Sequence, residues 1–224
     1  PSPFFYWRIC ATRNILSDYK GGGMEKTIMQ TSHGRIGFRD SGGSGVPLLF
    51  VHGNSLNMDL FEPLLDDLVS RGRRVAAFDL PGHGSSPCSD KPERDYGLGA
   101  YAALVRELSA GLGLERPVLV GHSLGGHIAM QALAGGLDGR GLFIFGTPPL
   151  GVPPDFSAAF NLSACGDWMF RGELSTEEIA GIAASCMPPA VPAPPEAVRA
   201  IAATDPRARI ELGLSLSRDA LFHE

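Results

Sequence analysis

The residues most suited to chemistry lie near the middle of the chain, in the segment Gly121-His122-Ser123-Leu124-Gly125. A short apolar run, residues 118–120, precedes this segment, and apolar residues at helical spacing follow it. This pattern predicts a strand, a sharp turn and a helix, with Ser123 at the apex. Such a turn strains the serine backbone and needs small residues two positions to either side, which Gly121 and Gly125 provide. Ser123 is the candidate nucleophile; a glycine-rich turn carrying an ordinary surface serine is the alternative.

The composition suits one ordinary globular domain, with 224 residues, 44% hydrophobic and 19% charged. The net charge is −5 with both signs interspersed, which argues against a nucleic-acid partner or an anionic membrane partner. The cysteines are widely spaced and form no Cys-x-x-Cys pair, which favours reduced thiols in a cytoplasmic protein over a disulfide framework or a cysteine metal site. They are Cys10, Cys88, Cys165 and Cys186. No motif indicates a metal, an organic cofactor or an oligomeric state.

Residues 1–23 differ in character from the rest of the chain. They lack the basic start, the long apolar stretch and the small-residue cleavage site of a signal peptide. They are also too short and too polar to span a bilayer. Met24 directly precedes a strand-like pattern, so we expect the natural domain to begin there and residues 1–23 to be an unstructured or non-native extension.

Apolar runs and helical patterns alternate along residues 24–148. The predicted strands are 27–31, 35–40, 48–51, 75–78, 117–120 and 142–145, and the helical stripes lie in 60–68, in 101–108 and after residue 124. The turn at residues 32–34 predicts a hairpin between the first two strands. The alternation predicts a mostly parallel sheet with helices on both faces and ligands at the carboxyl ends of the strands. The glycine-rich loop 41–45 lacks a phosphate-binding ending and is interpreted as a surface turn.

Three motifs stand at the ends of successive predicted strands. They are His52-Gly53-Asn54 after the third, Asp79-Leu80-Pro81-Gly82-His83-Gly84-Ser85-Ser86 after the fourth, and the serine turn after the fifth. With this order and spacing, residues 24–148 resemble the α/β-hydrolase fold family, in its serine-nucleophile esterase, lipase and haloperoxidase-like branch. The resemblance implies an incomplete α/β core over 24–148 and a helical cap over 149–224.

The resemblance also implies how Ser123 would be assisted. In the family, one oxyanion donor is the backbone N–H of the residue after the nucleophile, here Leu124, and the other maps to Asn54 in the loop after the third strand. Gly53, Gly121 and Gly125 would support these turns. His52 would hold its loop by hydrogen bonding and would not act as the base. His83, His122 and His127 are interpreted as packing or loop-fixing residues.

The chain departs from the family pattern after residue 145. No carboxylate follows the sixth strand, and no further buried β run appears. Instead, Ser175-Thr176-Glu177-Glu178 predicts a helix start, residues 179–186 keep helical spacing, 187–195 form a proline-rich link, and 206–221 predict another helix. We therefore expect the last two strands, the catalytic acid and the catalytic histidine to lie beyond residue 224, so that the chain as given is inactive. Weaker candidates for these roles are His223, Asp155, Asp167, Asp205 and Asp219.

The leading functional hypothesis is a serine hydrolase that cleaves a small-molecule carboxylic ester or related acyl compound through an acyl-enzyme. A carbon–carbon bond hydrolase and a cofactor-free haloperoxidase or perhydrolase would use the same serine. A non-catalytic ligand-binding protein of the same fold is an alternative of another class. An acidic or aromatic keto substrate would need a cation over the site, for which the sequence offers Arg171, Arg199, Arg207 and Arg209.

Overall fold

The computed structural model describes residues 24–150, 167–187 and 190–218. These residues form a six-stranded sheet with strand order β1-β2-β4-β3-β5-β6. The β1–β2 and β2–β4 pairs are antiparallel, and the other pairs are parallel. The strands are β1 (Thr27–Thr31), β2 (Gly34–Asp40), β3 (Leu48–Val51), β4 (Val75–Phe78), β5 (Val118–His122) and β6 (Gly141–Phe145). The predicted mostly parallel sheet is confirmed, and the predicted extension 1–23 lies outside the described residues.

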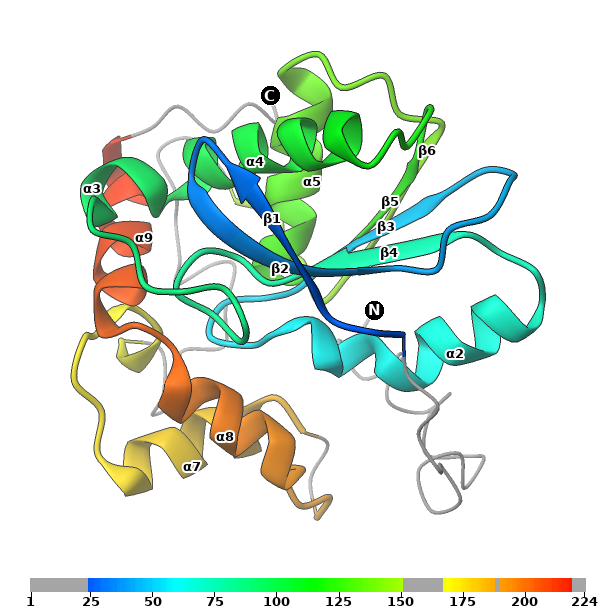
Figure 1. Ribbon diagram of the computed structural model, residues 1–224. Coiled ribbons are helices and arrows are strands. Elements are labelled where there is room, and N and C mark those ends of the chain that lie inside the picture. The colour runs from blue at the N-terminus through cyan, green and yellow to red at the C-terminus, as the bar shows by residue number, and fades with distance from the viewer. Residues whose placement is uncertain (1–23, 151–166, 188–189, 219–224) are drawn as a thin grey trace.

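Helices cover both faces of this sheet. The helix α4 (Leu98–Gly111) and the helix α5 (Leu124–Ala134) lie on one face, and α2 (Glu62–Ser70) lies on the other (Figure 1). A short 3₁₀ helix, η1 (Met58–Phe61), leads directly into α2. Every residue of β4 is buried, which explains why the central strands read as continuous apolar runs in the sequence.

Two apolar clusters make up the core, one on each face. The α4/α5 side includes Leu49, Val51 and Ile128, and the α2 side includes Phe50 and Leu65. Successive residues of β3 thus enter opposite clusters, because side chains alternate across a strand. Burying each such side chain stabilises the fold by roughly 1.5–3 kcal/mol.

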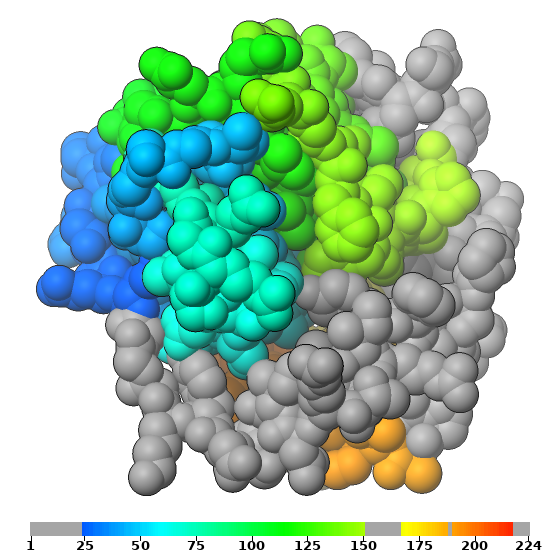
Figure 2. All heavy atoms as spheres, turned by 90° about the vertical axis from the view of Figure 1, so that its right-hand side faces the viewer, coloured from blue at the N-terminus to red at the C-terminus, as the bar shows by residue number. Residues whose placement is uncertain are grey.

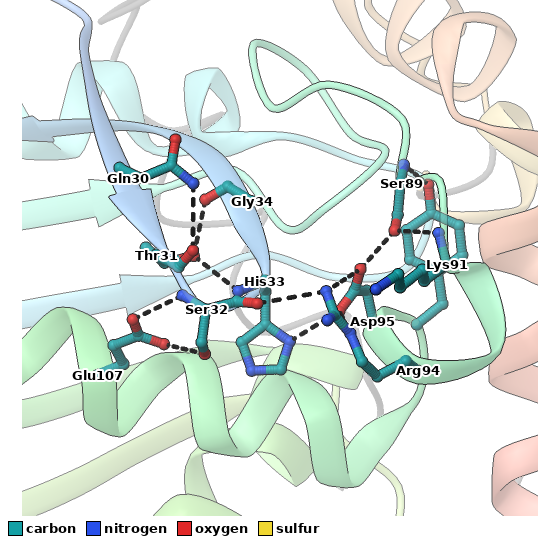
Figure 3. Close-up of polar contacts among 11 residues, drawn as sticks. Gln30, Thr31, Ser32, His33, Gly34, Ser89, Lys91, Arg94, Asp95 and Glu107 are labelled. Atoms are coloured by element: carbon teal, nitrogen blue, oxygen red, sulfur yellow. Dashed lines mark hydrogen bonds and ion pairs between the residues drawn. The ribbon is translucent and has the colours of Figure 1, made fainter.

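The β1–β2 hairpin is fastened to the helices through its turn, as Figure 3 shows. The Glu107 carboxylate of α4 accepts hydrogen bonds from the backbone N–H of Ser32 (2.8 Å) and from its hydroxyl (2.6 Å). His33 Nδ1 lies 3.3 Å from a carboxylate oxygen of Asp95, at the end of the short helix α3 (Pro92–Asp95). Arg94 Nε donates to the same carboxylate at 2.7 Å. These contacts fix the edge hairpin, whose predicted turn is confirmed.

A helical segment follows β6 in the chain and lies at one end of the sheet (Figure 1). Its elements are η2 (Trp168–Phe170), α7 (Thr176–Ser185), α8 (Pro195–Ala203) and α9 (Pro206–Arg218). The predicted start of α7 is confirmed, because Ser175 Oγ accepts from the Glu178 N–H while the Glu178 side chain accepts from the Ser175 N–H. The helix α8 is not among the predicted elements.

The helix α9 joins this segment to the core. Ser215 Oγ accepts a hydrogen bond from the backbone N–H of Leu98, the first residue of α4 (3.1 Å). A Cβ at Gly97 would stand 2.9 Å from the Ser215 Cβ, and Gly97 has a φ of +127°. Glycine therefore allows both the backbone turn and the close approach of α9.

Strand β6 forms one edge of the sheet and, within the described residues, pairs only with β5. Its side chains are unusually exposed for apolar residues: Leu142 is 38% accessible, Phe143 53% and Ile144 37%. The yellow-green segment that contains β6 reaches the surface in Figure 2. An exposed apolar edge of this kind favours association with other chains.

Candidate active site

Ser123 lies at the apex of the turn between β5 and α5. Its backbone has φ +52° and ψ −120°, a conformation that L-residues rarely adopt and that stores strain. The Ser123 N–H donates to the carbonyl of Phe145 (2.9 Å), and the Thr147 hydroxyl donates to the Ser123 carbonyl (2.9 Å). The backbone around the serine is therefore fixed from the side of β6.

The glycines around Ser123 are required by space. A Cβ at Gly121 would stand 2.5 Å from the carbonyl oxygen of Gly125. A Cβ at Gly125 would overlap the carbonyl oxygen of Val51, and one at Gly126 would overlap the Thr147 hydroxyl. Since the first two contacts are with backbone, no side-chain movement could relieve them. Larger residues would push α5 away from β5 and β3 and so open the turn.

The loop after β3 packs directly against this turn. A Cβ at Gly53 would stand 2.9 Å from His122 Nδ1 and 3.1 Å from the Ser123 Cβ, so only glycine allows the approach. His52 is fully buried; its Nε2 accepts from the Leu80 N–H (3.0 Å), which leaves Nδ1 to donate to the Gly53 carbonyl (2.8 Å). His52 thus links this loop to the loop after β4.

The oxyanion donors predicted from the sequence are the backbone N–H groups of Asn54 and Leu124. Asn54, Ser123 and Leu124 line the same cavity. Within the described part of the chain, neither the Asn54 N–H nor the Leu124 N–H has a hydrogen-bond partner. Leu124 is also the first residue of α5, whose N-terminus carries a partial positive charge. The arrangement can stabilise a negative oxygen on a group bound to Ser123.

Asp79 anchors the loop after β4. Its carboxylate is fully buried and accepts hydrogen bonds from the Met58 N–H (2.7 Å), the Ser85 N–H (2.7 Å) and the Ser85 hydroxyl (2.7 Å). Met58 begins η1, just after the loop that carries Asn54. One carboxylate therefore holds the loops after β3 and β4 together behind the candidate site.

Three histidines near the site favour the neutral form; His52 and His83 are buried, whereas His122 is partly exposed. Burial lowers the pKa of His52 to about 4, that of His83 to about 3, and that of His122 to about 4. His83 Nδ1 lies 2.9 Å from the Pro81 carbonyl, so it holds its own loop. Among the described residues, none hydrogen-bonds to the Ser123 hydroxyl.

A cavity of about 40 Å³ adjoins Ser123. The 3₁₀ helix η2 and α9 cover it on the side away from the sheet. The Asn54 side chain takes part in this cover, because its Nδ2 donates to the Met169 carbonyl at 2.8 Å. The lining residues are Asn54, Ser123, Leu124, His127, Pro148, Leu150, Met169, Phe170, Leu212 and Leu216. No sequence motif identified Met169 or Phe170 as cavity residues. The only local feature that could have done so is the apolar triplet Trp-Met-Phe, residues 168–170, within a more polar stretch.

A model of the alpha/beta hydrolase family matches residues 48–223. The chain belongs to the alpha/beta hydrolase family. Solved members agree with this assignment. The N-acyl homoserine lactonase AidH, solved with N-butanoyl homoserine, superposes with a TM-score of 0.78 and 34% identity, over 87% of this chain and 70% of that chain. An esterase from Exiguobacterium antarcticum shares the fold, with a TM-score of 0.63.

Curated relatives match over shorter stretches. The non-heme chloroperoxidase of Streptomyces lividans is 32% identical over 133 residues, which is 58% of this chain and 47% of that protein. An uncharacterised protein of Mycobacterium tuberculosis is 44% identical over 103 residues, 46% of this chain and 29% of its own length. The chain thus spans less than half the length of these two relatives. Alpha/beta hydrolases are usually hydrolytic enzymes acting on small molecules.

Of the weaker candidates for a catalytic acid and base, the two that the structure describes, Asp167 and Asp205, do not line the cavity beside Ser123. Asp205 is buried and engaged by the Tyr96 hydroxyl (2.6 Å) and by Arg207 (2.8 Å). Burial opposes ionisation of Asp205, but the hydrogen bonds from Arg207 and Tyr96 outweigh it and lower the pKa to about 2. Asp167 is exposed beside η2. His223, Asp155 and Asp219 lie outside the described residues.

The four arginines proposed as cations over the site are engaged elsewhere. Arg171 pairs with Glu178, Arg199 with Glu196, and Arg207 with Asp205. Arg209 is buried and donates to backbone carbonyls of residues 171, 172 and 201. Among the described residues, no charged side chain lines the cavity. In the same residues, no helix is long and apolar enough to cross a membrane, and no three potential metal ligands cluster.

Proposed function

We propose that the protein is a serine hydrolase that cleaves carboxylic esters, including cyclic ones, through an acyl-enzyme on Ser123. The Ser123 oxygen attacks the carbonyl carbon, the alcohol leaves with a proton, and water then releases the acid. The backbone N–H groups of Asn54 and Leu124 would hold the oxyanion, each contributing roughly 3 kcal/mol to the transition state. The observation that carries the proposal is a serine at φ +52° beside a mostly apolar cavity and two N–H groups that have no partner among the described residues.

The remaining parts of the proposal concern the rest of the machinery. Gly53, Gly121, Gly125 and His52 would keep the two loops in register with Ser123. The acid and the histidine that would activate Ser123 are not assigned to any of the described residues. Residues 24–148 would form the core and residues 149–224 the cap over the site, in a protein of the cytoplasm.

The substrate bond is inferred from the charge of the site and from relatives. AidH is named an N-acyl homoserine lactonase, and a lactone is a cyclic ester. An uncharged cavity lining suits a neutral acyl group better than the acidic or keto substrates of a carbon–carbon bond hydrolase. A carboxylic ester is therefore the bond we assign to this site.

The test uses the full-length protein, a fluorophosphonate probe and p-nitrophenyl acetate. Labelling at Ser123 and hydrolysis should both disappear in Ser123→Ala, with at least a thousandfold loss of rate. Ser70→Ala, which alters an exposed serine of α2, is the matched control and should behave as wild type. Absence of labelling in the unmodified protein would instead support the non-catalytic ligand-binding alternative.

A second candidate reaction is perhydrolysis. It is favoured by the similarity to the chloroperoxidase and to the non-heme haloperoxidase of Rhodococcus erythropolis, which is 37% identical over 128 residues. In that reaction hydrogen peroxide replaces water, so the acyl group leaves Ser123 as a peracid. Halogenation of monochlorodimedone in the presence of acetate, bromide and peroxide would measure it. A rate that survives Ser123→Ala would exclude this route.

A further inference from the structure

Phe170 lies between two hollows of the structure. Phe170 lines the cavity beside Ser123 and also lines a second, open hollow of about 310 Å³ on the outer side of α9, together with Ile210, Gly213 and Leu214. Among the described residues, Phe170 is the one that lines both spaces. We propose that Phe170 is the end wall of an acyl-chain pocket and limits the substrate to short, unbranched aliphatic acyl groups; the proposal rests on the proposed function.

The chemistry of the pocket wall favours an aliphatic chain. Most of its lining is apolar, formed by side chains such as Leu150, Met169, Leu212 and Leu216; besides Ser123, the polar side chains in the described lining are Asn54 and His127. The amide of Asn54 is occupied by the Met169 carbonyl. Against the apolar side chains a polar or charged acyl group would lose its hydration, whereas methylene groups would gain from burial.

The size of the pocket sets the length of the chain. A volume of about 40 Å³ accommodates roughly three water-sized groups, at about 10–15 Å³ each. That space suits an acetyl to butyryl group. A longer chain would have to displace the Phe170 ring, beyond which the outer hollow offers much more room.

The backbone on both sides of Phe170 is held in place. On one side, Asn54 Nδ2 binds the Met169 carbonyl at 2.8 Å. On the other side, the buried Arg209 donates to the Arg171 carbonyl (2.8 Å) and the Gly172 carbonyl (2.7 Å). The Phe170 ring also rests on α9, where a Cβ at Gly213 would stand 3.2 Å from the Phe170 Cβ. Removing the ring should therefore open a passage without moving the backbone.

The test compares p-nitrophenyl acetate, butyrate, hexanoate and octanoate with the full-length protein. In the wild-type protein, kcat/KM should fall for acyl chains longer than butyrate. In Phe170→Ala the octanoate-to-acetate ratio should rise at least tenfold, since each methylene buried in an apolar pocket is worth about fourfold. Leu214→Ala is the matched control, because Leu214 borders only the outer hollow and is 46% exposed; its ratio should match wild type.

The outcomes separate the two proposals. If acetate is cleaved through Ser123 but the ratio is unchanged in Phe170→Ala, the end wall is refuted and the proposed function stands. If no ester is cleaved through Ser123, both proposals fall. Should Phe170→Ala lose acetate hydrolysis as well, Phe170→Leu, which keeps an apolar side chain in η2, must raise the hexanoate-to-acetate ratio. An unchanged ratio there also refutes the end wall.

Discussion

Replacing Asp79 with asparagine should test how strongly the loops behind the site depend on one buried charge. The substitution keeps the shape of the side chain but turns one carboxylate oxygen into an NH₂ group. The two oxygens of Asp79 accept from the Met58 N–H on one side and from the Ser85 N–H and hydroxyl on the other. Either orientation of the amide therefore places its NH₂ group against a backbone N–H.

The cost follows from these contacts. One buried N–H loses its acceptor, which costs about 1–3 kcal/mol. The remaining hydrogen bonds lose their charge assistance, which costs about 1 kcal/mol each. The sum is about 3–5 kcal/mol, a large share of the roughly 5–15 kcal/mol that stabilises a typical domain. A domain of this size should melt about 6–20 °C lower.

Urea unfolding followed by circular dichroism measures this difference. Asp138→Asn is the matched control, because the Asp138 side chain is 75% exposed and its partner among the described residues is the exposed Arg116. The free energy of unfolding of the Asp138→Asn protein should fall by less than about 1 kcal/mol. An Asp79→Asn protein within about 1 kcal/mol of wild type by this measure would show that the three hydrogen bonds do not hold the loops.

Three further predictions concern the turn, the buried histidines and the sheet edge. Gly125→Ala should abolish Ser123-dependent hydrolysis and lower the free energy of unfolding by more than about 2 kcal/mol. Gly141→Ala is the control and should be tolerated in the same assays, because its Cβ would stand 3.8 Å from the nearest atom, Val118 Cγ2. Burial lowers the pKa values of His52 and His83 from 6.5 to about 4 and about 3, so the unfolded chain takes up protons first as the pH falls. The free energy of unfolding should therefore fall by about 2 kcal/mol per histidine between pH 7 and pH 5. Equal stability at both pH values would contradict this. Phe143→Lys should reduce self-association measured by light scattering, because Phe143 is 53% exposed on the edge strand β6. Unchanged scattering would mean that the chains do not associate through β6.

The sequence predicts the core because local patterns determine it. The buried strands are uniform apolar runs, the hairpin has a short turn, and α7 begins with a capping box. The serine turn is also local, since its strain and its glycines lie within six residues of one another. Each of these features can be recognised without knowing what lies across the fold.

The contacts that cover the cavity are not local, so the sequence predicted a helical cap without identifying Met169 and Phe170 as part of the cover. η2 is only three residues long, too short for a periodic pattern. Its position depends on Asn54, which contacts Met169 from 115 residues away along the chain. The helix α8 begins directly after a proline-rich stretch, with Pro195 as its first residue, so the same prolines that end a loop also start a helix.

Asp205 shows why residue type alone misleads about a catalytic role. It has the chemistry of a triad acid, yet its N–H donates to the Gly82 carbonyl (2.9 Å) and its carboxylate accepts from Tyr96. A Cβ at Gly82, where φ is +75°, would stand 2.6 Å from the Tyr96 hydroxyl and 3.0 Å from the Asp205 Cβ. The glycine in the loop after β4 therefore serves the docking of α9 as well as the turn. Asp205 hydrogen-bonds to the core through its N–H and through Tyr96, and Arg207 donates to both of its carboxylate oxygens. The carboxylate therefore fixes the cover over Ser123 and is not free to orient a histidine.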